Sequence, residues 1–232
     1  MKRSSQTIFY IVFISIIVGL FGLMTFHYLK YGDFPQHIGW AKELSTNGYI
    51  YKIPHTLLHR LVVIVRALLP ANVLVWISPL AKQVYDLKSF ELSMLIVVTL
   101  SYLLTAIILL RYLLRQWHER KSPNVSWWAA GVIFVLLLVT PVYLFSIPHM
   151  YLGYAVSNRF DNPTFNVLKP FVLLMFVSIL NNLYQKWNWR NSLWMALFVL
   201  CATLAKPSFT ITIIPAIGII FFLNLKEWKK VN

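Results

Sequence analysis

Long apolar runs separated by short basic clusters are the feature of this sequence that most limits its fold. No Lys, Arg, Asp or Glu interrupts residues 4–29, and a second such run covers 92–110. A membrane helix needs about 20 mostly apolar residues to cross the hydrocarbon core. Further apolar runs lie within 126–147, 167–184 and 192–225. The sequence therefore predicts an all-α, polytopic membrane helix bundle of about five or six spans, folded as one transmembrane domain.

Composition supports this class and excludes three others. Of the 232 residues, 59% are hydrophobic and 12% are charged, whereas about 25% of an average soluble domain is charged. This apolar content excludes a disordered chain, and a single cysteine, Cys201, excludes a disulfide-stapled secreted module. The net charge of +14 is carried mostly by clusters between apolar runs. Such clusters are typical of membrane loops rather than of a nucleic-acid-binding domain.

The first apolar run, 8–29, has two interpretations. Lys2 and Arg3 resemble the basic start of a signal peptide. The run is longer than the hydrophobic part of a usual signal peptide, however, and no Ala-x-Ala cleavage site follows it. An uncleaved membrane anchor is the interpretation that we favour.

Basic clusters predict the orientation, because cytoplasmic loops carry an excess of Lys and Arg. Four basic segments should therefore be cytoplasmic: the amino terminus and the clusters within 111–121, 186–190 and 226–230. They all fall on that side only if 57–81 does not cross the membrane. Basic and histidine side chains interrupt the first half of that segment, and two prolines break it. We therefore expect 30–90 to be one long extracytoplasmic loop of interfacial helices, in a multi-pass cell-membrane protein with both termini cytoplasmic. Seven basic residues in this loop weaken the charge argument, which applies poorly to long loops.

The last apolar stretch, 192–225, contains one break, at Lys206-Pro207. Proline removes a backbone donor, and a lysine is costly in the middle of a membrane. The stretch is therefore either two short helices that meet at Lys206 or a hairpin whose tip reaches the far interface. Lys206 itself either snorkels to the interface or receives an anionic headgroup at a broken helix.

Asp33 is the first candidate for chemistry, because it directly follows the first span. Gly32 and Pro35 flank it and can form a tight turn that directs the carboxylate towards the membrane face. His37 lies four residues further on and could pair with the acid for proton transfer. The alternative is that Asp33 is ordinary solvated surface.

His55 and His59 form a His-x-x-x-His pair, which on a helix would project both rings from one face. The intervening residues lack the catalytic glutamate of zinc peptidases, so we expect no metal site as such. A divalent cation with a contribution from Asp33 or Asp161 stays an open alternative. Interfacial histidines without any ligand are the other interpretation.

Arg159 and Asp161 are the only charged residues between Lys121 and Lys169. They stand in Asn158-Arg159-Phe160-Asp161-Asn162-Pro163-Thr164, where Asn-Pro initiates a turn and Thr can cap the next helix. The segment is therefore at least a capped turn that enters a span. A guanidinium at this place could also hold a phosphate in bidentate fashion.

The layout and four short motifs resemble the amino-terminal module of the GT-C superfamily of integral-membrane glycosyltransferases. Gly32-Asp33-Phe34-Pro35-Gln36-His37 is similar to that superfamily's acidic first-loop motif. Three further stretches also resemble members of the superfamily: Pro54-His55-Thr56-Leu57-Leu58-His59, Asn162-Pro163-Thr164 and Lys206-Pro207-Ser208-Phe209. The superfamily has more spans and often a carboxy-terminal domain, so the resemblance implies a truncated or split form with a missing portion or partner subunit.

This resemblance implies transfer of a sugar from a polyprenyl-phosphate carrier to an acceptor on the extracytoplasmic face. Asp33 would be the base that activates the acceptor hydroxyl, and Arg159 or Lys206 would hold the donor phosphate. Two alternatives come from other classes. One is a polytopic scaffold or assembly subunit that binds membrane lipids or proteins, and the other is a lipid or solute carrier. No nucleotide-binding glycine motif and no Asp-x-Asp pair occurs in the sequence.

Overall fold

The computed structural model describes residues 3–47, 56–69, 85–117, 124–138, 162–184 and 189–228. Within these ranges all regular structure is helical, which confirms the all-α class. The helices are α1 (Arg3–Tyr28), α2 (Phe34–Asn47), α3 (Thr56–Leu68), α5 (Tyr85–Gln116), α6 (Val125–Leu138), α7 (Pro163–Tyr184), α8 (Trp189–Ala205) and α9 (Pro207–Trp228).

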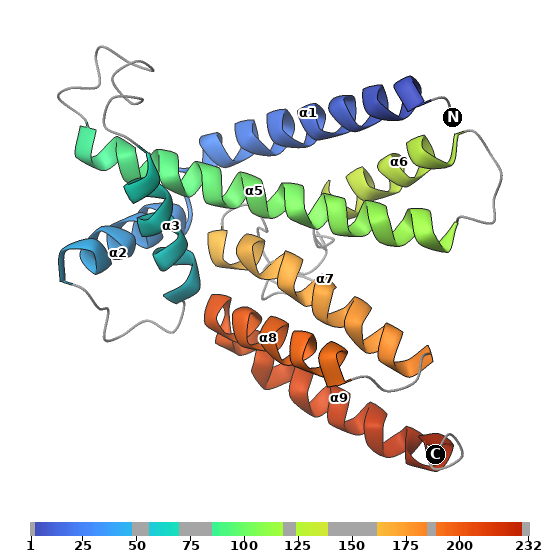
Figure 1. Cartoon of the computed structure of the whole chain (residues 1–232). Coiled ribbons are helices and arrows are strands. Elements are labelled where there is room, and N and C mark those ends of the chain that lie inside the picture. Colours follow the sequence, from blue (N-terminus) through green and yellow to red (C-terminus); the bar gives the residue numbers. More distant parts are fainter. Residues whose placement is uncertain are drawn as a thin grey trace, which may run out of the picture.

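The long helices lie roughly side by side around α5 (Figure 1). Helices α1 and α6 pack on one side of α5, and α7 packs on the other side. Helix α8 packs against α7, and α9 packs against α8. The two short helices, α2 and α3, cross the first part of α5. The end of α1, the start of α7 and the turn between α8 and α9 lie at the same end of the molecule as α2 and α3. We call this the α2–α3 end.

Two of the described helices are long and apolar enough to cross a membrane, by length and composition. The apolar parts are Ser5–Tyr28 in α1, with 24 residues, and Ser89–Gln116 in α5, with 28 residues. At about 1.5 Å per residue each exceeds the roughly 30 Å of a hydrocarbon core. Shorter apolar helices occupy Val125–Leu138, Pro163–Ile179 and Trp189–Ala205.

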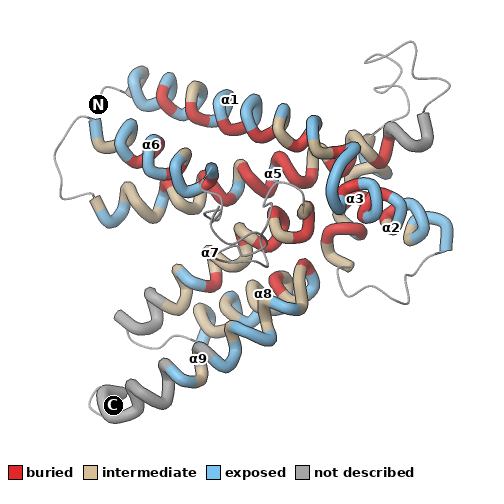
Figure 2. Tube along the Cα trace, turned by 180° about the vertical axis from the view of Figure 1, so that it is seen from behind, coloured by how far each residue is buried: buried red, intermediate tan, exposed pale blue. Residues whose placement is uncertain are grey.

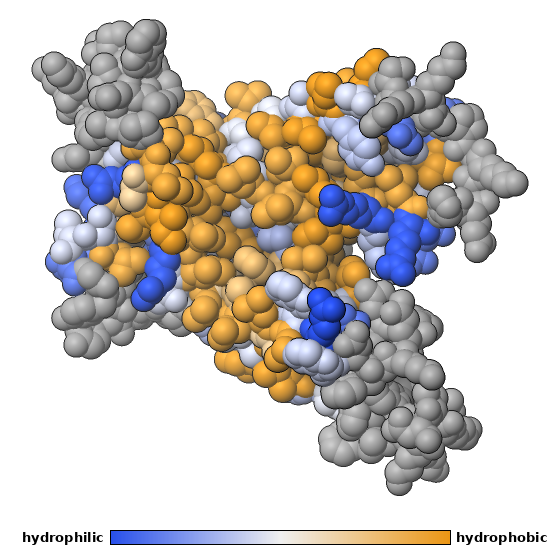
Figure 3. All heavy atoms as spheres, viewed as in Figure 1, coloured by the Kyte–Doolittle hydropathy of each residue, from blue (hydrophilic) through white to orange (hydrophobic). Residues whose placement is uncertain are grey.

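Helix α1 has a buried face and an exposed face (Figure 2), and apolar side chains occur on both. Phe9, Phe13, Ile17 and Phe21, at intervals of four residues, are buried against the bundle. The opposite face exposes large apolar side chains as well, including Ile11, Leu23 and Phe26. A helix in water normally has one polar face, so this all-round apolar surface is typical of a helix in lipid. Figure 3 shows apolar side chains over the middle of one face of the molecule and hydrophilic ones towards its ends.

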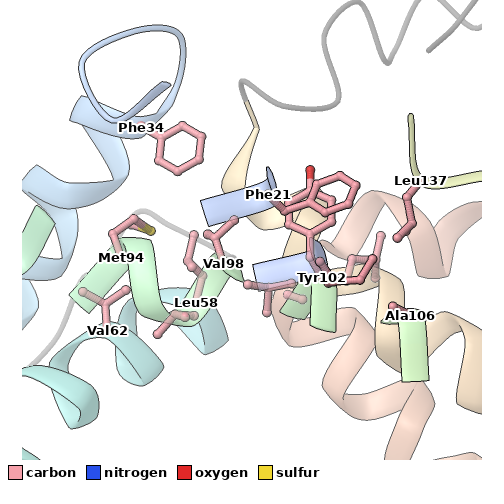
Figure 4. Packing of buried hydrophobic residues seen from close by; sticks show 14 of the residues in the cluster. Phe21, Phe34, Leu58, Val62, Met94, Val98, Tyr102, Ala106 and Leu137 are labelled. Carbon is pink, nitrogen blue, oxygen red and sulfur yellow. The ribbon is translucent and has the colours of Figure 1, made fainter. Parts of the chain in front are cut away.

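The buried core follows the inner side of α5 (Figure 4). Tyr102 of α5 is 1% exposed and stacks on Phe21 of α1 with 4.4 Å between the ring centroids. Towards the α2–α3 end, Met94 and Val98 meet side chains from α2 and α3, among them Phe34, Leu58 and Val62. One continuous apolar core therefore joins the short helices to the long ones.

The observed helices move two expected boundaries. Helix α5 begins at Tyr85, so the last residues of the expected loop 30–90 are the first turns of a long helix. Helix α7 begins at Pro163 rather than near Val167, because Asn162 caps it and proline suits a first helical position. The segment 139–147 of the third expected span lies outside the described residues. The position of the α7 start matters for function, because it places Asn166 and Lys169 in the first turns of the helix.

The break expected at Lys206 separates two helices. The Lys206 amide donates to Ala202 at 2.8 Å, and the amide of Phe209 donates to the Lys206 carbonyl at 3.1 Å. Pro207 opens α9 and lacks the N–H group that a first helical position leaves unsatisfied in any case. The chain reverses here, and α9 runs back along α8 (Figure 1).

Candidate functional site

Asp33 lies in the turn between α1 and α2, at the α2–α3 end. Gly32 before it has φ 60°, a left-handed backbone conformation that glycine adopts without a steric penalty. The Asp33 carbonyl accepts the first backbone hydrogen bond of α2, from the amide of His37 at 3.1 Å. Its exposed carboxylate accepts a hydrogen bond from Asn162 Nδ2 at 3.0 Å, across 129 positions of sequence. We expected Asp33 to lie beside the segment 158–164, and the described part of that segment, which begins at Asn162, does contact Asp33.

Asn162 connects the start of α7 to Asp33. Its Oδ1 atom accepts hydrogen bonds from the backbone amide of Phe165 at 3.1 Å and from the Thr164 hydroxyl. These bonds satisfy the first turn of α7 in the manner of an Asn N-cap. With Oδ1 committed to the cap, Nδ2 faces Asp33 and fixes the direction of the carboxylate. The cap of one helix thus positions an acid on another.

His37 contacts a partner that the sequence analysis did not assign to it. The expected partner was Asp33, but the His37 Nδ1 atom lies 2.9 Å from His59 Nε2. The two side chains are 4% and 0% exposed, and the Trp40 ring stands edge-on against both of them. The physical reason is the helical geometry of α2, which turns residue 37 inwards to α3 while Asp33 caps the helix outside. This pair joins α2 to α3.

Lys206 projects from the turn between α8 and α9, which lies at the α2–α3 end and outside the helices that carry the apolar runs. Its ammonium group lies 5.4 Å from the centroid of the Phe165 ring. Partial burial lowers the pKa of Lys206, and the negative charge of Asp33 opposes that shift. The Asp33 carboxylate therefore attracts the Lys206 ammonium group electrostatically. Burial of this cation is consistent with a site that excludes part of its water.

Lys169 is a second cation at this place, and the sequence analysis did not single it out. Its ammonium group lies 5.6 Å from the same Phe165 ring and 4.6 Å from the Tyr102 ring. It donates a hydrogen bond to Asn166 Oδ1 at 2.9 Å, and the Tyr102 hydroxyl donates to that same oxygen at 2.8 Å. Lys169 stands inside an expected span, and a charged residue in such a position is by default a functional candidate. This signal was available in the sequence.

Three predicted site residues lie outside the described residues. They are His55, Arg159 and Asp161. Their roles as phosphate or cation ligands remain predictions. Within the described ranges, no group of three or more His, Cys, Asp or Glu side chains is placed to hold a metal ion.

The site can supply one base and two cations. Asp33 provides a carboxylate that a neutral amide holds in place, and Lys206 and Lys169 place positive charges around one aromatic ring. Comparison with known proteins adds no relative: no family model, no curated protein and no solved structure matches the chain.

Proposed function

We propose that this chain is a GT-C-like glycosyltransferase, or part of one, that moves a sugar from a polyprenyl-phosphate donor to an acceptor on the extracytoplasmic face. The observation that carries the proposal is the hydrogen bond of Asn162 to Asp33, with Lys206 near enough to feel the charge of that carboxylate. A base and a cation beside each other are what glycosyl transfer from a phosphate requires.

The proposed topology has six spans, formed by α1, α5, α6, α7, α8 and α9. In Figure 1 these helices run alternately towards and away from the α2–α3 end, and the start of α1 and the end of α9 lie at the opposite end. Arg111 and Arg115 in the last turns of α5 and Arg190 at the start of α8 belong to that opposite end as well. Because positive charge favours the cytoplasm, this pattern supports cytoplasmic termini and an extracytoplasmic α2–α3 end.

The reaction that we propose breaks one bond and forms another. Asp33 takes the proton of the acceptor hydroxyl while the oxygen attacks the anomeric carbon of the donor sugar. The bond between that carbon and the phosphate oxygen breaks, and the lipid phosphate leaves with the electron pair. Lys206 stabilises the negative charge that grows on the leaving phosphate, in surroundings from which water is partly excluded. Arg159 is the second proposed phosphate ligand.

The direct test is sugar transfer in proteoliposomes by the wild type and by Asp33→Asn. Asparagine retains an oxygen that can accept the bond from Asn162, so the fold is preserved while the base is removed. We expect transfer to fall about 100- to 10,000-fold, the usual contribution of a general base. Arg111→Gln, a charge change at the opposite end, is the matched control and is expected to retain transfer.

The outcomes separate the functional classes. Wild-type transfer by Asp33→Asn would remove Asp33 as the base. No transfer by the wild type from any polyprenyl-phosphate sugar would favour a scaffold. Lipid or solute movement without covalent transfer would favour a carrier.

A further inference from the structure

Two ammonium groups share one aromatic ring at the α2–α3 end. Lys206 from the turn before α9 and Lys169 from α7 lie 5.4 Å and 5.6 Å from the centroid of Phe165. Each contact is a cation–π interaction, which stabilises a cation without neutralising its charge. The carboxylate of Asp33 is near but is exposed and hydrogen-bonded to Asn162. Among the side chains that the structure describes around this ring, two cations therefore accompany one carboxylate.

Asn166 adds a neutral donor beside these cations. Its side chain is 1% exposed, and among the residues that the structure describes its Nδ2 atom has no hydrogen-bond partner. The assignment of oxygen and nitrogen in this amide follows from its neighbour, because the ammonium group of Lys169 can only donate and so faces the oxygen. Nδ2 is bonded to the same carbon as Oδ1, so it lies next to the Lys169 contact. A buried donor without an acceptor is costly, unless a ligand supplies the acceptor.

We infer that Lys169, Lys206 and the Asn166 amide form a binding site for a phosphate-bearing anion beside Phe165. A phosphate monoester, such as the lipid phosphate that leaves in the proposed reaction, carries about −1.5 to −2 charges at pH 7, which matches two ammonium groups, and its oxygens supply the acceptor that Nδ2 lacks. A carboxylate would neutralise only one of the two cations. Both lysine side chains are long and flexible, so their ammonium groups can turn from the ring towards a shared anion.

This inference deepens the proposed function and rests on it for the reaction of the anion, but not for its binding. Lys169 lies six residues after Pro163, about 9 Å along the axis of α7. The site thus extends from the turn of Lys206 down into the bundle, where a lipid-borne phosphate can reach it from the bilayer. A free phosphate ion has the same binding chemistry, so the experiment needs both probes.

The test measures binding to the full chain in a neutral detergent, with inorganic phosphate and with dioleoyl phosphatidic acid, and with dioleoyl phosphatidylcholine as the lipid control. The variants are Lys169→Gln and Asn166→Asp. Aspartate keeps an oxygen for Tyr102 and Lys169 but replaces the donor by a second, charged oxygen, so it removes the Nδ2 donor and part of the positive charge of the site while it preserves the side-chain size. Lys42→Gln, the same charge change on an exposed face of α2, is the matched control.

We expect the wild type to bind a phosphate probe and both site variants to bind it about 10- to 100-fold more weakly. Lys42→Gln is expected to stay within about twofold, because exposed charges contribute little. Binding of phosphatidic acid alone would identify a lipid headgroup as the ligand. Binding of both probes would identify a small phosphate anion as sufficient. Either result supports the site. No binding by the wild type, or an equal loss in Lys42→Gln, would overturn it.

The same experiment keeps the two proposals distinguishable. Phosphate binding that depends on Lys169 and Asn166, in a chain that transfers no sugar, would leave this inference standing and remove the proposed function. Sugar transfer that is unchanged by Lys169→Gln and Asn166→Asp would support the proposed function and remove this inference.

Discussion

The two ends of the bundle use their polar residues differently. At the α2–α3 end, polar side chains from distant parts of the sequence bind one another, as Asn162 binds Asp33 and as His37 pairs with His59. At the opposite end, the charged Arg111, Arg115 and Arg190 are exposed. Charge at that end is therefore suited to orientation in a membrane, whereas hydrogen bonds at the α2–α3 end hold polar groups from different helices together.

The sharpest way to break this comparison is Asn162→Asp. Aspartate retains the oxygen that caps α7, but it places a second carboxylate against Asp33. The two like charges repel each other, so the Asp33 carboxylate turns away from the position in which Asn162 holds it. We expect sugar transfer to fall about 10- to 100-fold, a part of the roughly 10²–10⁴-fold contribution of a general base.

The matched control for that prediction is Asn162→Ser. Serine is also a good helix cap, but it neither donates from the amide position nor adds charge. We expect a smaller loss of transfer. Equal transfer rates for the two variants would show that Asn162 acts on stability alone.

The second prediction concerns the histidine pair, which we expect to hold α2 on α3. His59→Leu leaves the buried His37 ring against an apolar side chain and should lower the free energy of unfolding by about 1–3 kcal/mol. The double variant His37→Leu/His59→Leu removes both polar partners and should recover most of that loss. Chemical denaturation in detergent measures both. A double variant that is as unstable as the sum of the single ones would contradict a direct pair.

The double variant also tests the catalytic role that the sequence predicted for His37. If the pair is structural, sugar transfer by the refolded double variant stays near that of the wild type. A large loss of transfer at normal stability would return His37 to the catalytic group.

The smallest expected effect is on the pH dependence of stability. Burial lowers the pKa of Lys206 below its value in the unfolded chain, so the folded state binds fewer protons between the two values. Stability should therefore rise with pH across that window, and Lys206→Met should remove this rise. Asp33 opposes the shift, so Asp33→Asn should widen the window towards lower pH. A thermal-unfolding series from pH 8 to 11 measures the slopes, and identical slopes in all three proteins would contradict the burial of Lys206.

The sequence could predict the elements better than the contacts between them. The apolar runs predicted α1 and α5, and Lys206-Pro207 predicted the break between α8 and α9, because run length and proline act locally. The motif around Asn162 predicted a capped turn near Asp33, but it predicted Thr164 as the cap, and Asn162 caps α7 instead, with Thr164 inside the helix. The pairing of His37 with His59 could not be predicted, since it depends on how α2 turns against α3. Nor could spacing along one helix show that Tyr102 of α5 meets Asn166 of α7.

The division between the two ends is tested most directly by which side of the membrane each end faces. Cysteines introduced at Ser45 in α2 and at Gln116 at the end of α5, both exposed positions, report the two ends in a Cys201→Ala background. With a membrane-impermeant maleimide on intact cells, we predict labelling of Ser45→Cys and protection of Gln116→Cys until the membrane is opened. Labelling of both positions from the same side would contradict the account.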